Sequence, residues 1–199
     1  MDWLFSNLQA LLLQFGYLAL FAIVFAESGL FFGFFLPGDS LLFVAGLLAS
    51  QGYFKVFIVW LVIFLGAVLG DQAGYWMGKK WGRGFFVRPD SWLFNPKRLI
   101  QAEAFYQKHG KKTIVLARFV PAVRTFTPIF AGISQMDYST FVKFNVLGGF
   151  LWTTIFVAAG YFLGKTIPDA ENYLPIIVLG VIVLSFMPLA LEYLKNRGK

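Results

Sequence analysis

Five charged residues stand inside long apolar stretches of the sequence: Glu27, Asp39, Asp71, Arg118 and Arg124. A charge at the centre of a bilayer costs about 2.5–3.5 kcal/mol on insertion scales, so the acids and arginines are expected to pair. A guanidinium also suits phosphate, because its planar fork donates to two oxygens and stays protonated. Carboxyl groups in a low-dielectric cavity bind protons readily, which makes Glu27 and Asp39 candidate proton carriers. Asp71 is a weaker candidate, since it lies near the end of its segment where water can reach it.

Two interpretations of these charges remain open from the residues alone. The charges either form a buried ion-pair clasp, or form a site that opens for an anionic substrate and closes behind it. We favour the site, because ionisable groups inside membranes are usually functional. For Asp71 the alternative is simple packing near Gly70 and Gly74.

The composition is that of an integral membrane protein. Of the 199 residues, 58% are hydrophobic and 14% are charged, with a mean hydropathy of +0.69, whereas soluble domains carry about 25% charged residues. The chain has no Cys and one His, His109, which excludes disulfides, thiolate nucleophiles and two-His metal motifs. No phosphate-binding glycine loop or G-x-S-x-G motif occurs. We therefore expect no metal, no cofactor and no enzyme, although chemistry by Asp or Ser stays an alternative.

The distribution of basic residues predicts the topology. The net charge of +7 comes largely from residues 79–112, which hold nine Lys or Arg, and from Lys195, Arg197 and Lys199. The positive-inside rule places both regions in the cytoplasm, and the charge favours anionic lipid as a partner, not nucleic acid. The apolar segments are about 8–35, 40–50, 56–78, 113–133, 141–164 and 173–193.

Both basic regions can share one side only if a segment between them turns back. We expect 113–133 to be a re-entrant loop, because Pro121 and Pro128 break helices and Arg118 and Arg124 would face lipid on a plain span. By the same logic, Pro37 and Gly38 mark a second re-entrant loop at about 30–50, which enters from the outside.

An internal repeat supports this arrangement. Gly74-Tyr75-x-x-Gly78-Lys79 matches Gly160-Tyr161-x-x-Gly164-Lys165, and each motif closes an apolar segment that follows a proline-broken loop ending in Ala-Gly. The charge distribution gives the two segments opposite directions, which is typical of inverted-repeat transporters. Chance recurrence of small residues that pack helices is the alternative.

These observations predict an all-α polytopic membrane protein. We expect one membrane domain over 1–199, an inverted repeat, two opposed re-entrant hairpin loops and about four full transmembrane helices, among them 56–78, 141–164 and 173–193. The basic stretch 79–112 is expected to carry a helix that begins at Asn95-Pro96 and lies on the cytoplasmic membrane surface. A helix that packs on the soluble side is equally compatible with that stretch.

The same residues resemble the bacterial DedA family, the VTT or SNARE-associated membrane proteins. The resemblance rests on the run from Glu27 through Pro37-Gly38-Asp39-Ser40 to Gly46, and on His109-Gly110 through Arg118 and Arg124 to Phe126. Gly70-Asp71 before Gly74-Tyr75, and the stretch from Asn145 through Trp152, add to it. It implies a multi-pass inner-membrane protein whose acidic pair is Glu27 and Asp39 and whose arginine pair is Arg118 and Arg124. It also implies proton-motive-force-dependent membrane homeostasis, with some members described as flippases of undecaprenyl phosphate or other phospholipids.

We therefore expect a proton-coupled transporter that moves an anionic lipid, such as undecaprenyl phosphate or a phospholipid, between leaflets. Arg118 and Arg124 would bind the headgroup, and Glu27, Asp39 and Asp71 would exchange protons. Two alternatives remain: a proton- or cation-coupled carrier of a small soluble solute, and a non-transporting membrane assembly protein. The small-residue faces also allow an oligomer.

Overall fold

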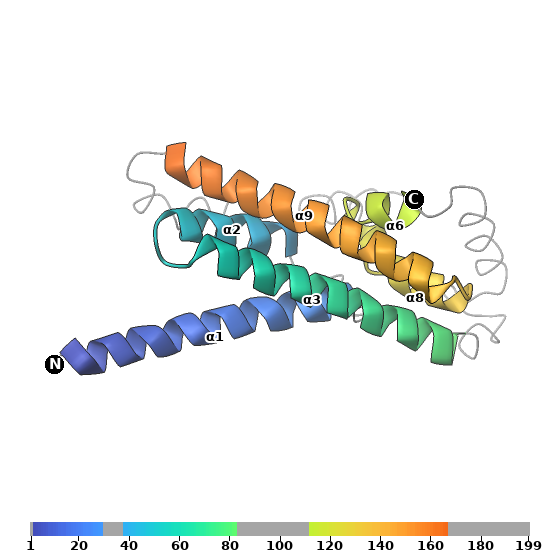
Figure 1. The fold of residues 1–199 in the computed structure, drawn as a ribbon, viewed down its shortest axis with the longest axis horizontal. Helices are drawn as coiled ribbons and strands as arrows, with labels where there is room; N and C mark the ends of the chain where they lie inside the picture. The colour runs from blue at the N-terminus through green and yellow to red at the C-terminus, as the bar shows by residue number, and fades with distance from the viewer. Residues whose placement is uncertain (1, 30–37, 83–111, 167–199) are drawn as a thin grey trace, which may run out of the picture. The chain divides into compact units, whose positions relative to one another are not determined.

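The computed structural model describes residues 2–29, 38–82 and 112–166, which form helices joined by short turns, with no strand among them. The elements, shown in Figure 1, are α1 (Asp2–Gly29), α2 (Gly38–Ser50), α3 (Val56–Met77), its π-helical extension η2 (Gly78–Gly82), α6 (Lys112–Ala117), α7 (Pro121–Arg124), α8 (Thr127–Ile133) and α9 (Tyr138–Thr166). The predicted all-α class is confirmed over this part of the chain. The expectations for Pro37, His109, the helix from Asn95 and the segment 173–193 lie outside the described residues.

Two of the described helical stretches, Val56–Gly82 and Tyr138–Thr166, are long and apolar enough to cross a membrane. They correspond to the predicted segments 56–78 and 141–164. Along α3 the side chains of Phe57, Leu61, Leu65 and Leu69 are exposed at intervals of four residues, which places them on one face of the helix. A continuous exposed apolar stripe of this kind is stable against lipid and unfavourable in water.

The segment after residue 112 is broken into three short helices. Pro121 begins α7 and Pro128 lies in the first turn of α8, where the missing backbone N–H of proline breaks no helical hydrogen bond. The hydroxyl of Thr127 donates to the carbonyl oxygen of Val123 at 2.8 Å and links α7 to α8. Residues 112–133 therefore do not form one continuous rod.

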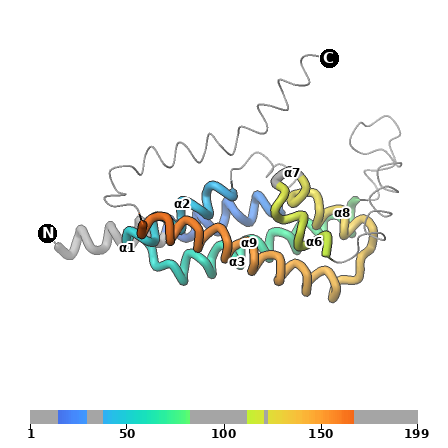
Figure 2. Tube along the Cα trace, turned by 90° about the horizontal axis from the view of Figure 1, so that it is seen from above, coloured from blue at the N-terminus to red at the C-terminus, as the bar shows by residue number. Residues whose placement is uncertain are grey.

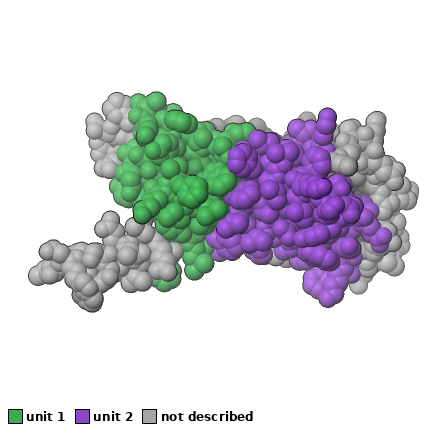
Figure 3. All heavy atoms as spheres, viewed as in Figure 1, with its two compact units in different colours: residues 1–20, 37–62, 153–199 green, residues 21–36, 63–152 purple. Residues whose placement is uncertain are grey.

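The chain forms two compact units, coloured separately in Figure 3. Among described residues, unit 1 holds the N-terminal part of α1, α2, the start of α3 and the end of α9. Unit 2 holds the end of α1, the rest of α3, η2, α6, α7, α8 and the first half of α9. Each unit thus combines segments from both halves of the sequence.

The core of unit 2 forms around Tyr75. Its ring stacks on that of Phe141 with centroids 4.6 Å apart, and Ile114 and Ala131 complete the buried cluster. The Tyr75 hydroxyl donates to the carbonyl oxygen of Met136 at 2.5 Å. α3, α6, α8 and α9 each supply one of the four core residues, so this cluster holds the broken segment against the two long helices. Figure 2 shows the course of these helices.

The start of α9 is capped by Asp137. Its carboxylate accepts hydrogen bonds from the Ser139 hydroxyl at 2.6 Å and the Thr140 backbone N–H at 2.8 Å. These hydrogen bonds, the Ser139 bond foremost, hold the pKa of Asp137 below its usual value. The cap therefore stabilises the helix at neutral pH, and this contribution is lost as the pH falls through that lowered pKa.

Both copies of the repeated glycine motif pack on a short helix from the other half of the sequence. In unit 2, Gly78 of η2 lies against the backbone of Ile129 in α8, so closely that an added Cβ would overlap the Ile129 carbonyl oxygen. In unit 1, Gly160 of α9 lies in the same way against the carbonyl oxygen of Phe43 in α2. Small residues allow this approach of two backbones. The repeat thus has a packing role in each unit.

The two short helices α2 and α8 end in the same type of cap, which predicts opposite effects of substitution. Gly52 (φ 86°) follows α2 and Gln135 (φ 52°) follows α8, each in a left-handed conformation that favours glycine. No neighbour lies within 4 Å of a Cβ added at Gly52, so the cost there is one of backbone conformation. We expect Gly52→Ala to lower the free energy of unfolding by about 1 kcal/mol and Gln135→Gly to raise it by about 0.5 kcal/mol. Thermal unfolding in detergent measures both free energies. Changes of the same sign and size in the two variants would contradict the assignment of left-handed caps at these positions.

Candidate functional site

Two arginines of the broken segment, Arg118 and Arg124, are buried in unit 2. Arg118 lies in the link between α6 and α7, and Arg124 is the last residue of α7. They are 4% and 8% exposed. A guanidinium cannot give up its proton at these positions, so each arginine requires a compensating partner.

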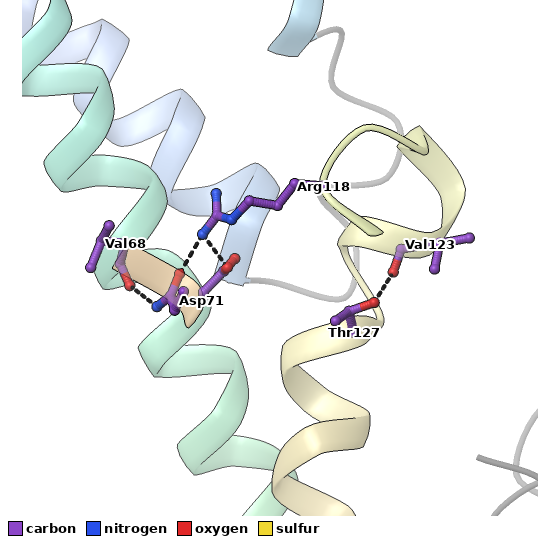
Figure 4. Close-up of polar contacts among 6 residues, drawn as sticks. Val68, Asp71, Arg118, Val123 and Thr127 are labelled. Carbon is purple, nitrogen blue, oxygen red and sulfur yellow. Dashed lines mark hydrogen bonds and ion pairs between the residues drawn. The ribbon is translucent and has the colours of Figure 1, made fainter. Parts of the chain in front are cut away.

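Arg118 is held by two side chains from the two long helices (Figure 4). Its Nη2 donates to the carboxylate of Asp71 in α3 and to the amide oxygen of Asn145 in α9. Asn145 in turn donates to the carbonyl oxygen of Val68 at 3.1 Å, and this bond fixes the orientation of its amide. Asp71 is 4% exposed and Asn145 is fully buried. Arg118 therefore joins the loop, α3 and α9.

Two adjacent glycines in α9 make room for the Arg118 side chain. A Cβ added at Gly148 would lie 3.0 Å from Cδ of Arg118 and 3.2 Å from Cα of Val115. A Cβ added at Gly149 would lie 3.0 Å from Cγ2 of Val68 and 3.7 Å from Cζ of Arg118. Larger residues here would push the guanidinium away from Asp71.

Arg124 has a different environment. Its Nη2 donates to the carboxylate of Glu27 at the end of α1, and its Cζ lies 4.9 Å from the ring centroid of Trp152 in α9. Glu27 is 1% exposed, so this ion pair is also buried. An aromatic face stabilises a desolvated guanidinium by about 2 kcal/mol or more, without using its hydrogen-bond donors.

The site retains buried polar atoms whose hydrogen-bonding capacity is unused. Among the described residues, Nε of Arg118 and the hydroxyl of Thr125 have no hydrogen-bond partner. Thr125 follows Arg124 directly and is 2% exposed. The described residues contain no group of three His, Cys, Asp or Glu that could hold a metal ion.

The sequence predicted the charges of this site but not all of the pairing. We expected Glu27 and Asp39 to face the two arginines, and Glu27 does pair with Arg124. The partner of Arg118, however, is Asp71. The prediction that water reaches Asp71 is wrong, because the loop and α9 cover this residue. Asp39 lies half-buried in the first turn of α2, in unit 1, and its pairing with an arginine stays a prediction. Gly38 is buried at the start of the same helix.

Sequence reasoning missed the contribution of α9. Asn145, Gly148, Gly149 and Trp152 are spaced by three to four residues and therefore lie on one face of the helix. An amide, two glycines and a tryptophan on the same face of an apolar helix indicate a packed polar contact. That spacing was the signal in the sequence that could have identified the role of α9.

Comparison with known proteins places this site in a family. The VTT domain matches residues 36–162, which include α2, α3, both arginines and most of α9. The chain belongs to the DedA family of membrane proteins. This DedA-family chain is similar to Protein DedA of Escherichia coli K12, with 42% identity over 196 residues that cover 96% of this chain and 89% of that protein.

Two other relatives extend the comparison. The membrane protein Rv0364 of Mycobacterium tuberculosis is 43% identical over 168 residues, covering 83% of this chain and 73% of the relative. The inner membrane protein YqjA of Escherichia coli K12 is 38% identical over 152 residues, covering 75% and 68%. No solved structure matches the chain. Both of these relatives are named as membrane proteins.

The buried pair of Arg118 and Asp71 predicts an asymmetric response to mutation. Asp71→Asn leaves the guanidinium buried without a counter-charge, so we expect it to lower the free energy of unfolding by about 3–5 kcal/mol. The double variant Asp71→Asn/Arg118→Leu removes both charges and is expected to lose less than the single variant. Unfolding in detergent measures the two free energies. A double variant less stable than Asp71→Asn would contradict the ion-pair interpretation.

Proposed function

We propose that this DedA-family protein is a transporter that moves an anionic lipid headgroup across the inner membrane of a bacterium, coupled to protons. The observation that carries the proposal is the pair of buried guanidinium groups on a broken segment, each joined to a carboxylate of a long helix. Ionisable groups at such positions usually mark a substrate or ion pathway. Undecaprenyl phosphate and phospholipids have the required charge, and their tails can stay in the bilayer.

The chemistry proposed is an exchange of partners at the guanidinium groups. A phosphate oxygen replaces the carboxylate of Glu27 on Arg124, and the released carboxyl group takes up a proton, so that no net negative charge is left buried. Return of the carboxylate expels the headgroup and releases the proton. Trp152 remains against the guanidinium throughout this exchange, since it contacts the face of the group and not its N–H donors. Asp71 and Asp39 are proposed as further proton carriers.

The proposed topology follows from the same residues. The break at Pro121 and Pro128 supports a re-entrant hairpin over 113–133, and Gly38 at the start of α2 supports a second one at about 30–50. With the two apolar spans and the segments at both ends of the chain, this arrangement has about four full crossings. The basic residues then place the C-terminus in the cytoplasm.

A non-transporting assembly protein is the second candidate. The closed contacts of Arg118, which bonds to Asp71 and Asn145 at once, favour a clasp at this arginine. The ring of Trp152 contacts the face of the Arg124 guanidinium and not its N–H groups, so the ring can stay in place when the hydrogen-bond partner changes, which favours transport there. A carrier of a small soluble solute would use the same charges but would require a cavity closed to lipid.

Removal of Arg124 is expected to stop headgroup movement. In liposomes that contain a fluorescent anionic lipid, we expect Arg124→Ala to lower the translocation rate at least about tenfold, equivalent to about 1.4 kcal/mol in the barrier. Arg124→Lys keeps the charge but loses the planar fork and is expected to retain only part of the rate. Lys143→Ala, an exposed cation of α9, is the control. Parental rates in Arg124→Ala would overturn the proposal.

Exchanging the two charges separates transport from a clasp. The double variant Glu27→Arg/Arg124→Glu restores an ion pair but moves the guanidinium from the loop to α1. We expect it to recover thermal stability relative to the single variants and to remain inactive in translocation. Full recovery of cellular function by this double variant would instead establish the assembly protein.

A further inference from the structure

The two units contain the same helix-packing contact. In unit 2, an added Cβ at Gly132 of α8 would meet the carbonyl oxygen of Tyr75 and the backbone nitrogen of Lys79, four residues later. In unit 1, an added Cβ at Gly46 of α2 would meet the carbonyl oxygen of Val157 and the backbone nitrogen of Tyr161, again four residues later. A glycine of a short helix thus lies over one turn of a long helix in both cases.

The repeat reveals a difference between these two contacts. The motif copies are 86 positions apart, so Gly46 corresponds to Gly132 and Tyr161 corresponds to Tyr75. If both pairs had the same register, Gly46 would lie over the turn that begins at Tyr161. It lies over the turn that begins at Val157, which is four residues, or one helical turn, earlier.

A second contact shows the same displacement. Ile129 of α8, which faces Gly78, corresponds to Phe43 of α2. The equivalent of Gly78 is Gly164, yet the carbonyl oxygen of Phe43 faces Gly160. Two glycine contacts in each pair of helices therefore agree on a displacement of one turn, in the same direction along the long helix.

We propose that these two registers are alternative states of one packing, and that each pair of helices moves between them by one turn, about 5.4 Å. In one state α8 occupies its register on α3 and α2 occupies its own on α9, as observed. In the other state α8 has on α3 the register that α2 now has on α9, and α2 has on α9 the register that α8 now has on α3. Elements of a repeat that pack in two discrete ways provide the two conformations that alternating access requires.

The glycines of each motif match this proposal. In the observed register Gly78 is needed to admit the Ile129 carbonyl, whereas a Cβ at Gly74 would lie 3.3 Å from Cβ of Pro128 and 3.5 Å from Cγ1 of Ile129, which is close but open to adjustment. After a shift of one turn, Gly74 takes the place of Gly78 against Ile129. In unit 1 the motif's second glycine, Gly164, now faces the side chain of Ser50 and would receive Phe43. Each motif thus carries one glycine for each register.

The ion pairs connect this movement to the proposed transport, on which the inference rests. α8 follows α7 directly, and the loop that holds it carries both arginines. Arg118 bonds to Asp71 on α3, the helix along which α8 would move. The observed register is therefore held while the ion pairs of both arginines are closed, and the proposed replacement of Glu27 by a phosphate on Arg124, at the end of α7, loosens it.

Spin-label distances test the inference in the full chain. The sequence contains no Cys, so Lys80→Cys with Gln135→Cys in unit 2 gives a single labelled pair without background. Gln135 moves with α8, because its backbone N–H donates to the carbonyl oxygen of Gly132 at 3.1 Å. Tyr53→Cys with Phe162→Cys is the corresponding pair in unit 1. Both pairs are measured in phosphatidylglycerol vesicles, in the parent, in Gly74→Ala and in Gly78→Ala.

The matched glycine variants are expected to select opposite registers. Gly74→Ala blocks the shifted register, so its unit 2 distance stays single and translocation falls at least about tenfold. Gly78→Ala disfavours the observed register and moves the distance distribution by about 5 Å. Identical distance distributions in vesicle-inserted Gly74→Ala and Gly78→Ala would overturn the inference. If the parent shows two distances but translocates no lipid, the register change is retained and the proposed function is refuted instead.

Discussion

The structure depends on the burial of two positive charges that cannot be neutralised. Arg118 and Arg124 keep their protons in the apolar interior, so the surrounding elements have to provide carboxylates, an amide and an aromatic ring. This requirement explains features that otherwise look unrelated. The polar face of α9 and the two glycines beside Arg118 all serve the placement of a guanidinium.

The balance of energies at these pairs supports the proposed exchange of partners. Desolvation of two charges consumes most of the Coulomb energy that their attraction provides, so a buried ion pair contributes little net stability although loss of one partner is severe. A phosphate group can replace a carboxylate at the guanidinium with a small net change in free energy. In the proposed exchange, the ring of Trp152 would stay against the Arg124 guanidinium while the hydrogen-bond partner of that group changes.

Packing between the halves of the sequence gives the charges a mechanical connection. The glycine motif of α3 and η2 supports α8 from the second half, and the glycine motif of α9 supports α2 from the first half. Close backbone contacts of this kind have discrete registers, since a partial shift would place a carbonyl oxygen against a side chain. In the proposed movement, the short broken segment couples charge pairing to helix register.

How much the sequence determines differs between elements of this chain. The apolar spans, the break at Pro121 and Pro128 and the identity of the buried charges follow from the sequence, because hydropathy, proline geometry and the cost of a charge in lipid act locally. The pairing of Arg118 with Asp71 does not follow, since it depends on which turn of α3 lies beside the loop, and several acids had the right charge. The roles of Asn145, Gly148 and Trp152 likewise required the position of α9. Local chemistry thus determined which groups need partners, and only tertiary packing decided the partners, because that choice depends on distances between segments far apart in the chain.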